Sequence, residues 1–102
     1  TVQYAIIDAA ASGDNTIVAA DGTNKIRVLS WVLVASGTVT VRWESGAGGT
    51  ALSGQMNLVA NTGVSSGYNP HGHFQTAAAT LLNLELSAGV SVDGHITYVV
   101  AV

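Results

Sequence analysis

The sequence contains no cysteine, and it has only three basic residues in 102, namely Lys25, Arg27 and Arg42. Without cysteine the chain has no disulfide bonds, thiolate nucleophiles or Cys-ligated metals, so its fold depends on packing and hydrogen bonds. Without a cluster of Lys and Arg it cannot displace the counterions of a phosphate backbone. Nucleic acid and anionic membrane surfaces are therefore excluded as expected partners.

Charge of either sign is scarce. Only 9% of the residues are charged, against an average of about 25% in soluble domains. Serine, threonine, asparagine and glycine occupy the polar positions instead. A surface with so few charges is poorly protected against association. We therefore expect part of it to be buried against copies of the same chain or against another partner.

Long apolar runs are also absent, since no stretch approaches the roughly 18 residues that a membrane-spanning helix needs. The opening residues, TVQYAIIDAA, include Asp8 and no basic residue, so we do not expect a secretory signal there. The length fits one domain, which we place at residues 1–102.

Turn-forming residues recur along the chain, for example in SGDN (12–15), ADGTN (20–24) and SGAGGT (45–50). Between them lie short segments rich in Val, Ile, Leu and Thr, a pattern typical of a β-sandwich or barrel. The predicted strands are Val2–Ala10, Thr16–Ala19, Lys25–Ala35, Val39–Glu44, Ala51–Leu52, Gln55–Val59, Val64–Ser66, His73–Ala77, Leu81–Leu86 and Ile96–Val102. About eight antiparallel strands in one short chain predict two packed sheets, so the expected fold is an all-β, jelly-roll-like antiparallel β-sandwich.

Three local features refine this expectation. Asp93-Gly94 is a tight-turn pair that is predicted to lead into the last strand. The stretch QTAAATLLNLEL leaves a short helical turn at 76–80 open as an alternative. Residues 1–11 are expected to form an edge strand or an exchanged arm, which could add a strand to a neighbour.

The segment KIRVLSWVLVAS, residues 25–36, is apolar on both faces when it is read with a period of two. A two-layer sandwich covers only one face of each sheet, so the second face needs a further layer. The scarcity of charge favours another subunit over a loop as that layer. We therefore predict a subunit interface formed by Val28, Trp31, Val32 and Val34.

Two histidines stand two residues apart in HGH, at His71 and His73. In extended backbone their side chains would project to the same side and could share a metal ion. A site needs about four ligands, and only two are visible here. An exposed loop after Pro70 is therefore the preferred interpretation, and neither a metal nor another cofactor is predicted.

No catalytic constellation is visible. The chain has no Gly-x-Ser-x-Gly elbow, and SGAGGT lacks the Lys-Ser/Thr of a phosphate loop. The six carboxylates are scattered, and nothing indicates a pair that converges for glycoside hydrolysis. His95 could pair with Asp93 or Ser91, but a strand position beside a turn is the preferred interpretation. We do not expect an enzyme.

Two aromatic residues, Tyr68 and Phe74, flank the NPHGH loop and are the ones best placed for recognition at the surface. With Asn69, His71 and His73 they form a candidate ligand-binding loop. Trp31 and Trp43 could stack a sugar, but they lie on otherwise apolar strand faces, so core or interface packing is preferred.

Three stretches carry a family resemblance: NTIVAADGTNKIRVLSWVLVASGTVTVRWESG (15–46), NPHGHFQTAAATLLNLELS (69–87) and VDGHITYVVAV (92–102). Together they resemble the small all-β virion proteins of tailed phages, which are the cement or decoration proteins of the head and related fibre-tip domains. The resemblance rests on strands and turns. It implies a jelly-roll-like fold, a homotrimer, the major capsid protein as partner, and no enzymatic activity.

Two functions follow as hypotheses. The leading one is a structural virion protein that decorates a phage head as a homotrimer and stabilises it, made in the host cytoplasm and located on the capsid surface. The alternative is a trimeric tail-fibre module that binds a receptor or a carbohydrate through the loop around residues 68–74.

Overall fold

The computed structural model describes residues 1–102 and consists of β-strands, turns and loops. The strands are β1 (Gln3–Ala9), β2 (Gly13–Val18), β3 (Lys25–Ala35), β4 (Val39–Ser45), β5 (Thr50–Ala51), β6 (Met56–Leu58), β7 (Thr62–Ser66), β8 (Phe74–Gln75), β9 (Leu82–Leu86) and β10 (Val92–Ala101). A helix able to cross a lipid bilayer is not present.

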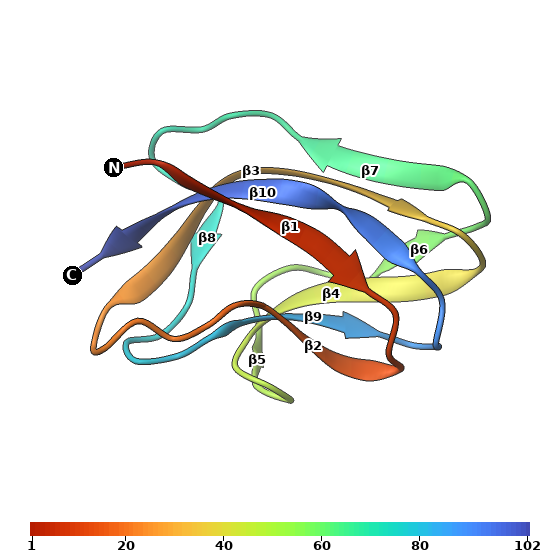
Figure 1. Cartoon of the computed structure of the whole chain (residues 1–102), viewed down its shortest axis with the longest axis horizontal. Helices are drawn as coiled ribbons and strands as arrows, with labels where there is room; N and C mark the ends of the chain where they lie inside the picture. Colours follow the sequence, from red (N-terminus) through yellow and green to blue (C-terminus); the bar gives the residue numbers. More distant parts are fainter.

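The strands form two antiparallel sheets that pack face to face (Figure 1). Sheet A has the order β1-β10-β3-β7, and β8 also pairs with β3. Sheet B has the order β2-β9-β4-β5, and β6 also pairs with β4. The chain passes repeatedly from one sheet to the other, and its first and last strands are neighbours, which is the wrapping of a jelly roll. The predicted antiparallel β-sandwich is confirmed.

Each of the ten strands overlaps one of the ten predicted segments, and they exceed the eight or so strands expected for the sandwich because one edge of each sheet is interrupted. Along β3, the edge is occupied first by β7 and then, after a loop, by β8. Along β4, β5 and β6 take successive parts of the edge in the same way. The helical turn at 76–80 that the sequence left open as an alternative does not form, and residues 3–9 form β1 as an edge strand within the same chain.

The last strand begins earlier than the sequence predicted. Asp93 and Gly94 lie inside β10, where they pair with β1 on one side and with β3 on the other. The turn predicted at Asp93-Gly94 is therefore wrong. Glycine is needed here for close packing rather than for a turn, because a Cβ at position 94 would collide with the carbonyl oxygen of Val32.

The hydrophobic core lies between the two sheets and is centred on aromatic residues. Trp31 packs edge-on against Trp43, with ring centroids 5.8 Å apart, and Phe74 lies 6.1 Å from Trp43. Val39 and Val41 alternate into this core with Trp43, as predicted, and the three leucines of β9 lie beside them on the same face of sheet B. Burying each large apolar side chain contributes roughly 1.5–3 kcal/mol.

Strand β3 changes its inward-facing residues part-way along its length. Val28 pairs with Tyr98 and Ser30 pairs with Thr97, so Leu29 is an extra residue opposite β10. Such a β-bulge shifts the alternation by one residue. Before the bulge the even-numbered residues of β3 face the core, and after the bulge the odd-numbered residues do. The predicted division of this strand into two opposed apolar faces is wrong for that reason.

The bulge corrects two of the four predicted interface positions. Val28 is 0% exposed and Trp31 is 8% exposed, and both belong to the core of the single chain. Their side chains are not available to a neighbouring subunit. Val32 is half-buried and Val34 is exposed on the outer face of sheet A, so the interface role of these two positions stays a prediction.

Leu29 is buried too, although it lies outside the main core cluster. The loop of residues 67–73, between β7 and β8, runs beside it. The backbone N–H of Asn69 donates to the Leu29 carbonyl over 2.9 Å, and that of His73 donates to Val28 over 2.8 Å. The loop thus supplies hydrogen-bond donors to the backbone carbonyls of β3 at the bulge. The chain itself covers this part of β3, where a neighbouring subunit was predicted.

Replacing Gly94 with alanine is expected to lower the free energy of unfolding by about 3 kcal/mol, because β3 and β10 must move apart to admit the Cβ. Urea denaturation followed by circular dichroism measures the change. Gly54→Ala is the matched control, since a Cβ there meets no atom within 4 Å. Equal losses in the two variants would contradict the close packing of β3 and β10 at Gly94.

Candidate interaction surface

Strand β1 forms a free edge of sheet A, and it turns outward two large apolar side chains, Tyr4 and Ile6, followed by Asp8 near its end. Tyr4 is 82% exposed and Ile6 is 78% exposed. The pairing of β1 with β10 is regular from Gln3 to Ala9, without a bulge. The edge is therefore seven residues long, regular and unpaired on its outer side.

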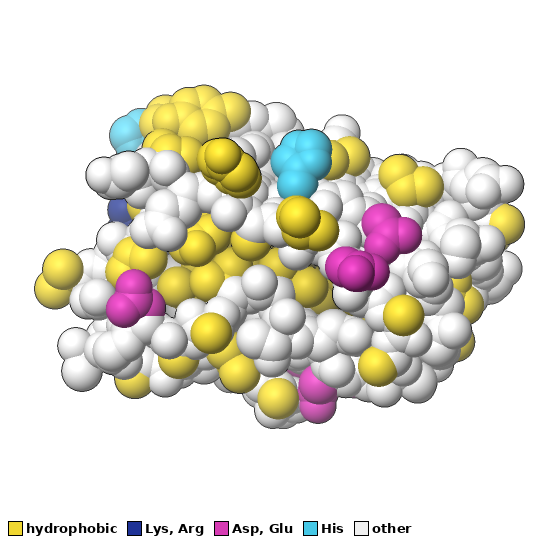
Figure 2. All heavy atoms as spheres, in the orientation of Figure 1, with side chains coloured by type: hydrophobic (Ala, Val, Ile, Leu, Met, Phe, Trp, Pro, Cys, Tyr) yellow, Lys and Arg dark blue, Asp and Glu magenta, His cyan; other side chains and the backbone are white.

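The apolar surface continues from β1 across the outer face of sheet A. The register places Ile6 opposite His95 and His95 opposite Val32, so these three residues form a row across β1, β10 and β3. Tyr4 and Val34 lie on the same face. We call these five residues the outer-face patch. Figure 2 shows hydrophobic side chains standing out from the sheet that contains β1, with very little basic surface in view.

His95 has a different setting from the one the sequence predicted. It lies within β10, between β1 and β3, rather than beside a turn. Its ring is exposed at the surface and makes no hydrogen bond within the chain. It is therefore a polar member of the outer-face patch.

The other sheet edges are protected in ways that β1 is not. The edge strand β2 has a register shift between Thr16 and Val18. Asn15 on that strand uses its side-chain amide for the carbonyls of Ala11 and Gly13. Strands β5 and β8 have two residues each, and the exposed positions of β7 are occupied by threonine, glycine and serine. Bulges, short strands and polar residues are the usual protection of an edge. Strand β1 has seven residues and no bulge, and its one charged residue, Asp8, lies near its end.

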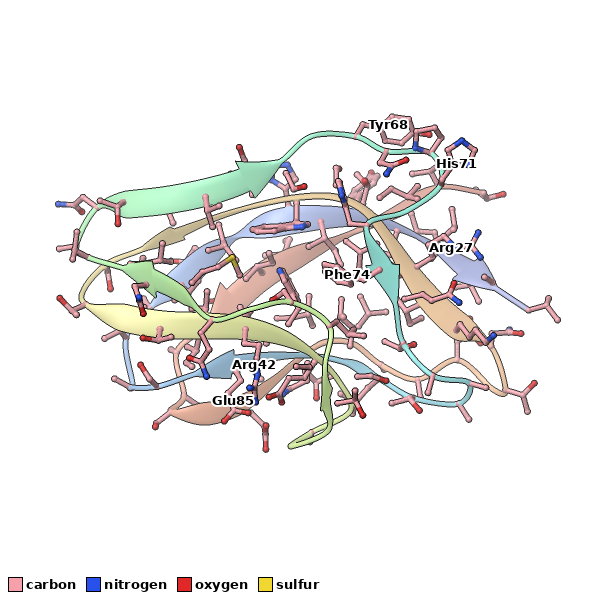
Figure 3. All side chains as sticks on the ribbon, turned by 180° about the vertical axis from the view of Figure 1, so that it is seen from behind. Arg27, Arg42, Tyr68, His71, Phe74 and Glu85 are labelled. Carbon is pink, nitrogen blue, oxygen red and sulfur yellow. The ribbon has the colours of Figure 1, made fainter.

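Three of the five residues of the predicted ligand-binding loop, Tyr68, His71 and His73, are exposed to solvent. Tyr68 and His71 lie together on the outside of the loop, whereas Phe74 points into the molecule (Figure 3). Phe74 packs against Trp43 and is therefore a core residue.

The remaining two residues hold the loop in shape. The Asn69 side chain accepts from the His71 backbone N–H over 3.0 Å and donates to the Gly72 carbonyl over 3.3 Å. The His73 ring lies 2.7 Å from the Gly67 carbonyl through Nε2. Gly72 has a φ of 86°, so the backbone is not extended between the two histidines. The premise that both imidazoles project to one side therefore fails.

A second polar cluster lies on the outer face of sheet B, where three carboxylates from different strands converge. Oxygens of Asp14, Glu44 and Glu85 all lie within 4.8 Å of one another. Glu44 is fully buried, and its two oxygens accept from Arg42 and from the amide of Asn83. Arg42 and Glu85 are neighbours in Figure 3, and the strand register pairs them directly.

The cluster joins three strands through Asn83, which is buried. Its amide nitrogen donates to Asp14 over 2.9 Å and to Glu44 over 3.0 Å, and its oxygen accepts from the Asn15 backbone N–H over 2.8 Å. Asp14 also accepts from the backbone of Gly48 over 3.0 Å, which ties the loop after β4 to sheet B. Most polar groups of the cluster are thus hydrogen-bonded to one another or to the backbone of the chain.

The cluster changes the acidity of one of its members. A hydrogen bond between the Glu85 and Glu44 carboxyl groups raises the pKa of Glu85 above 4.5. Desolvation and the negative charges of Glu44 and Asp14 raise this pKa further, and the charge of Arg42 opposes them. A protonated Glu85 donates to Glu44 and relieves the repulsion, so the folded chain binds this proton more tightly than the unfolded chain does.

Sequence reasoning found the first surface only in part, through the expected edge strand at residues 1–11 and through Val32 and Val34, and it missed the carboxylate cluster. The outward positions Tyr4 and Ile6 alternate with inward ones, and that signal was present in TVQYAIIDAA. The convergence of Asp14, Glu44 and Glu85 depends on which strands pair and in what register. That information comes from the tertiary structure, since the three residues are far apart in sequence.

Comparisons with known proteins add one structural likeness. No protein-family model matches the chain, and no curated protein matches it. A solved structure that it is similar to comes from work described as "Bacillus endospore appendages form a novel family of disulfide-linked pili". The TM-score is 0.57 at 17% sequence identity, over 100% of this chain and 88% of that one. At this identity the likeness shows a shared all-β fold and nothing more specific.

Replacing Glu85 with glutamine is expected to raise the melting temperature at pH 7, because the variant removes a carboxylate from a site that already holds two others. The wild type should have the full contribution of the Glu85 proton below pH 4.5 and lose it as the pH rises through the raised pKa. The gap between variant and wild type should therefore grow as the pH rises through that pKa.

Thermal unfolding followed by circular dichroism at several pH values between 4.5 and 7 tests this dependence. Asp21→Asn is the matched control, since Asp21 is exposed and lies outside the cluster. A gap that is independent of pH, or one that the control reproduces, would show that Glu85 does not carry the effect.

Proposed function

We propose that the chain is a structural subunit that works by assembling with copies of itself through β1 and the outer-face patch. The observation that carries this proposal is the edge formed by β1, which is regular, exposed and apolar at Tyr4 and Ile6. An unprotected strand of this kind is a template for pairing with another chain. The low charge of the sequence leaves little to oppose that pairing.

The structural likeness supports a role of this class. The protein with the shared fold belongs to appendages described as pili, and a pilus is an assembly of many copies. Those pili are described as disulfide-linked, whereas this chain has no cysteine. Copies of this chain would therefore be joined by strand pairing and apolar contact alone.

For the assembly itself we propose a homotrimer that decorates a phage head, as the resemblance in the sequence implies. The three copies would contact one another through β1 and the outer-face patch, and the trimer would bridge neighbouring copies of the major capsid protein. Each bridge buries surface that shell expansion would expose again, so binding opposes expansion. Because many copies bind around the shell, contacts that are individually weak give a high overall avidity. The proposed location is the capsid surface of the virion, and the role requires no catalysis.

A second candidate function is a trimeric tail-fibre module that binds a receptor or a carbohydrate. The observation that favours it is the loop of residues 67–73, which presents Tyr68 and His71 to solvent on a well-ordered turn. Aromatic and imidazole rings that stand clear of the surface are suited to stacking on a sugar.

Replacing Ile6 with aspartate is expected to convert the oligomer into a folded monomer. Ile6 is 78% exposed in the single chain, so the charge should be tolerated by the fold but should be buried and unpaired in the assembly. Native mass spectrometry and light scattering measure the oligomeric state, and circular dichroism confirms folding. Val59→Asp is the matched control, because Val59 is exposed but lies outside β1 and the outer-face patch.

The wild type should be a trimer at micromolar concentration, and only Ile6→Asp should abolish it. An open filament in negative-stain electron microscopy would replace the closed trimer with a head-to-tail polymer built on the same contact. A monomeric wild type, or equal assembly of both variants, would refute self-assembly through β1.

The two candidate functions predict different binding partners. Wild-type protein and the double variant Tyr68→Ala, His71→Ala should both co-sediment with expanded, undecorated phage heads. Binding that occurs only to host cells, and that the double variant loses, would instead establish the receptor-binding function. Cryo-electron microscopy of saturated heads would show whether the protein bridges capsid subunits.

A further inference from the structure

A cavity of about 340 Å³ opens at one end of the sandwich. Its walls come from both sheets: Lys25 begins β3, Ser45 ends β4, and Gln75 ends β8. Thr76 and Ala77 follow β8, and Thr50 and Leu52 complete the lining. The cavity is separate from β1, from the outer-face patch and from the loop of residues 67–73.

Two of the hydroxyl groups that line this cavity are buried, and each has an O–H that donates no hydrogen bond within the chain. Thr76 is 2% exposed, and its Oγ1 accepts the backbone N–H of Ile26 over 2.9 Å. Ser45 is 9% exposed, and its Oγ accepts the backbone N–H of Ala77 over 2.9 Å. Neither hydroxyl donates its own proton to an acceptor in the chain. Since a hydroxyl both donates and accepts, each leaves an O–H available to a ligand.

The remaining polar groups of the lining are also donors. Gln75 uses its amide oxygen to accept from Arg27 Nε over 3.1 Å, which leaves its NH₂ group without a partner in the chain. Lys25 forms no ion pair, since the ion pair of the structure joins Arg42 and Glu44. No aspartate or glutamate lines the cavity. A molecule that enters it therefore meets a positive charge and several unpaired N–H and O–H groups.

We propose that this cavity binds a small organic carboxylate, of the size of one sugar acid. The carboxylate is an acceptor-only group with about four lone-pair sites, which matches a lining that offers donors. Lys25 would pair with its charge, and the Ser45 and Thr76 hydroxyls would donate to its oxygens. Leu52 and Ala77 provide apolar surface for the body of the ligand. The volume is at the lower end of the range of small-molecule sites, which limits the ligand to roughly one ring.

The experiment is a titration of ¹⁵N-labelled protein, followed by ¹H–¹⁵N correlation NMR at constant ionic strength. Three probes are compared: D-glucuronate, N-acetylglycine and D-glucose. The two carboxylates share the recognised group on different bodies, and glucose keeps the sugar ring without the charge. We expect at least one carboxylate to shift the backbone amides of Ser45, Thr76 and Ala77, and glucose to leave them unchanged.

Two substitutions at one position assign the effect to the charge. Lys25→Met keeps the length of the side chain and is expected to weaken carboxylate binding by about tenfold or more, since a charge-assisted hydrogen bond is lost. Lys25→Arg keeps the charge and should stay within about threefold of the wild type. The spectra report at the same time whether each variant is folded.

The proposal is overturned if neither carboxylate shifts these amides, if glucose shifts them equally, or if Lys25→Met binds as the wild type does. Binding at the cavity is measured independently of assembly, so these results do not depend on the oligomeric state.

Discussion

The pairing of β3 with β10 determines what this molecule buries and what it exposes. The two strands run together for most of their length, and the single extra residue at Leu29 shifts the alternation of β3 by one position. Because of that shift, Val28 and Trp31 both enter the core, and Val32 and Val34 both face outward. A strand that looks apolar on both sides in the sequence thus contributes most of its apolar residues to one core.

The loop of residues 67–73 follows from the same bulge. Near Leu29, the edge of β3 is paired with neither β7 nor β8. The backbone N–H groups of Asn69 and His73 in the loop supply the hydrogen bonds there instead. The loop is therefore fixed in place by the strand that it covers. Its outward residues, Tyr68 and His71, are held on an ordered support, which is the arrangement that recognition loops need.

Much of the fold could be predicted from periodicity and turns. The bounds of β3 coincide with the prediction, and the alternation at Val39, Val41 and Trp43 placed these residues in the core correctly. The turn predicted at Asp93-Gly94 was wrong, because a glycine that is required for close packing against Val32 looks the same in the sequence as a glycine in a turn. A bulge has no reliable signature of its own, since it depends on the register of the partner strand. The candidate surfaces were found only in part for that reason, and the cavity beside Lys25 brings together residues from both sheets.

The pairing of the first strand with the last has a consequence for how the chain is made. Gln3 pairs with Tyr98, so all the residues between β1 and β10 must be synthesised before β1 meets its partner strand. During that interval both of its sides are unpaired. Contacts this distant in sequence also form slowly. A nascent β1 could therefore be captured by β10 of a completed neighbour, and the order of translation itself gives crowded copies an opportunity to exchange strands.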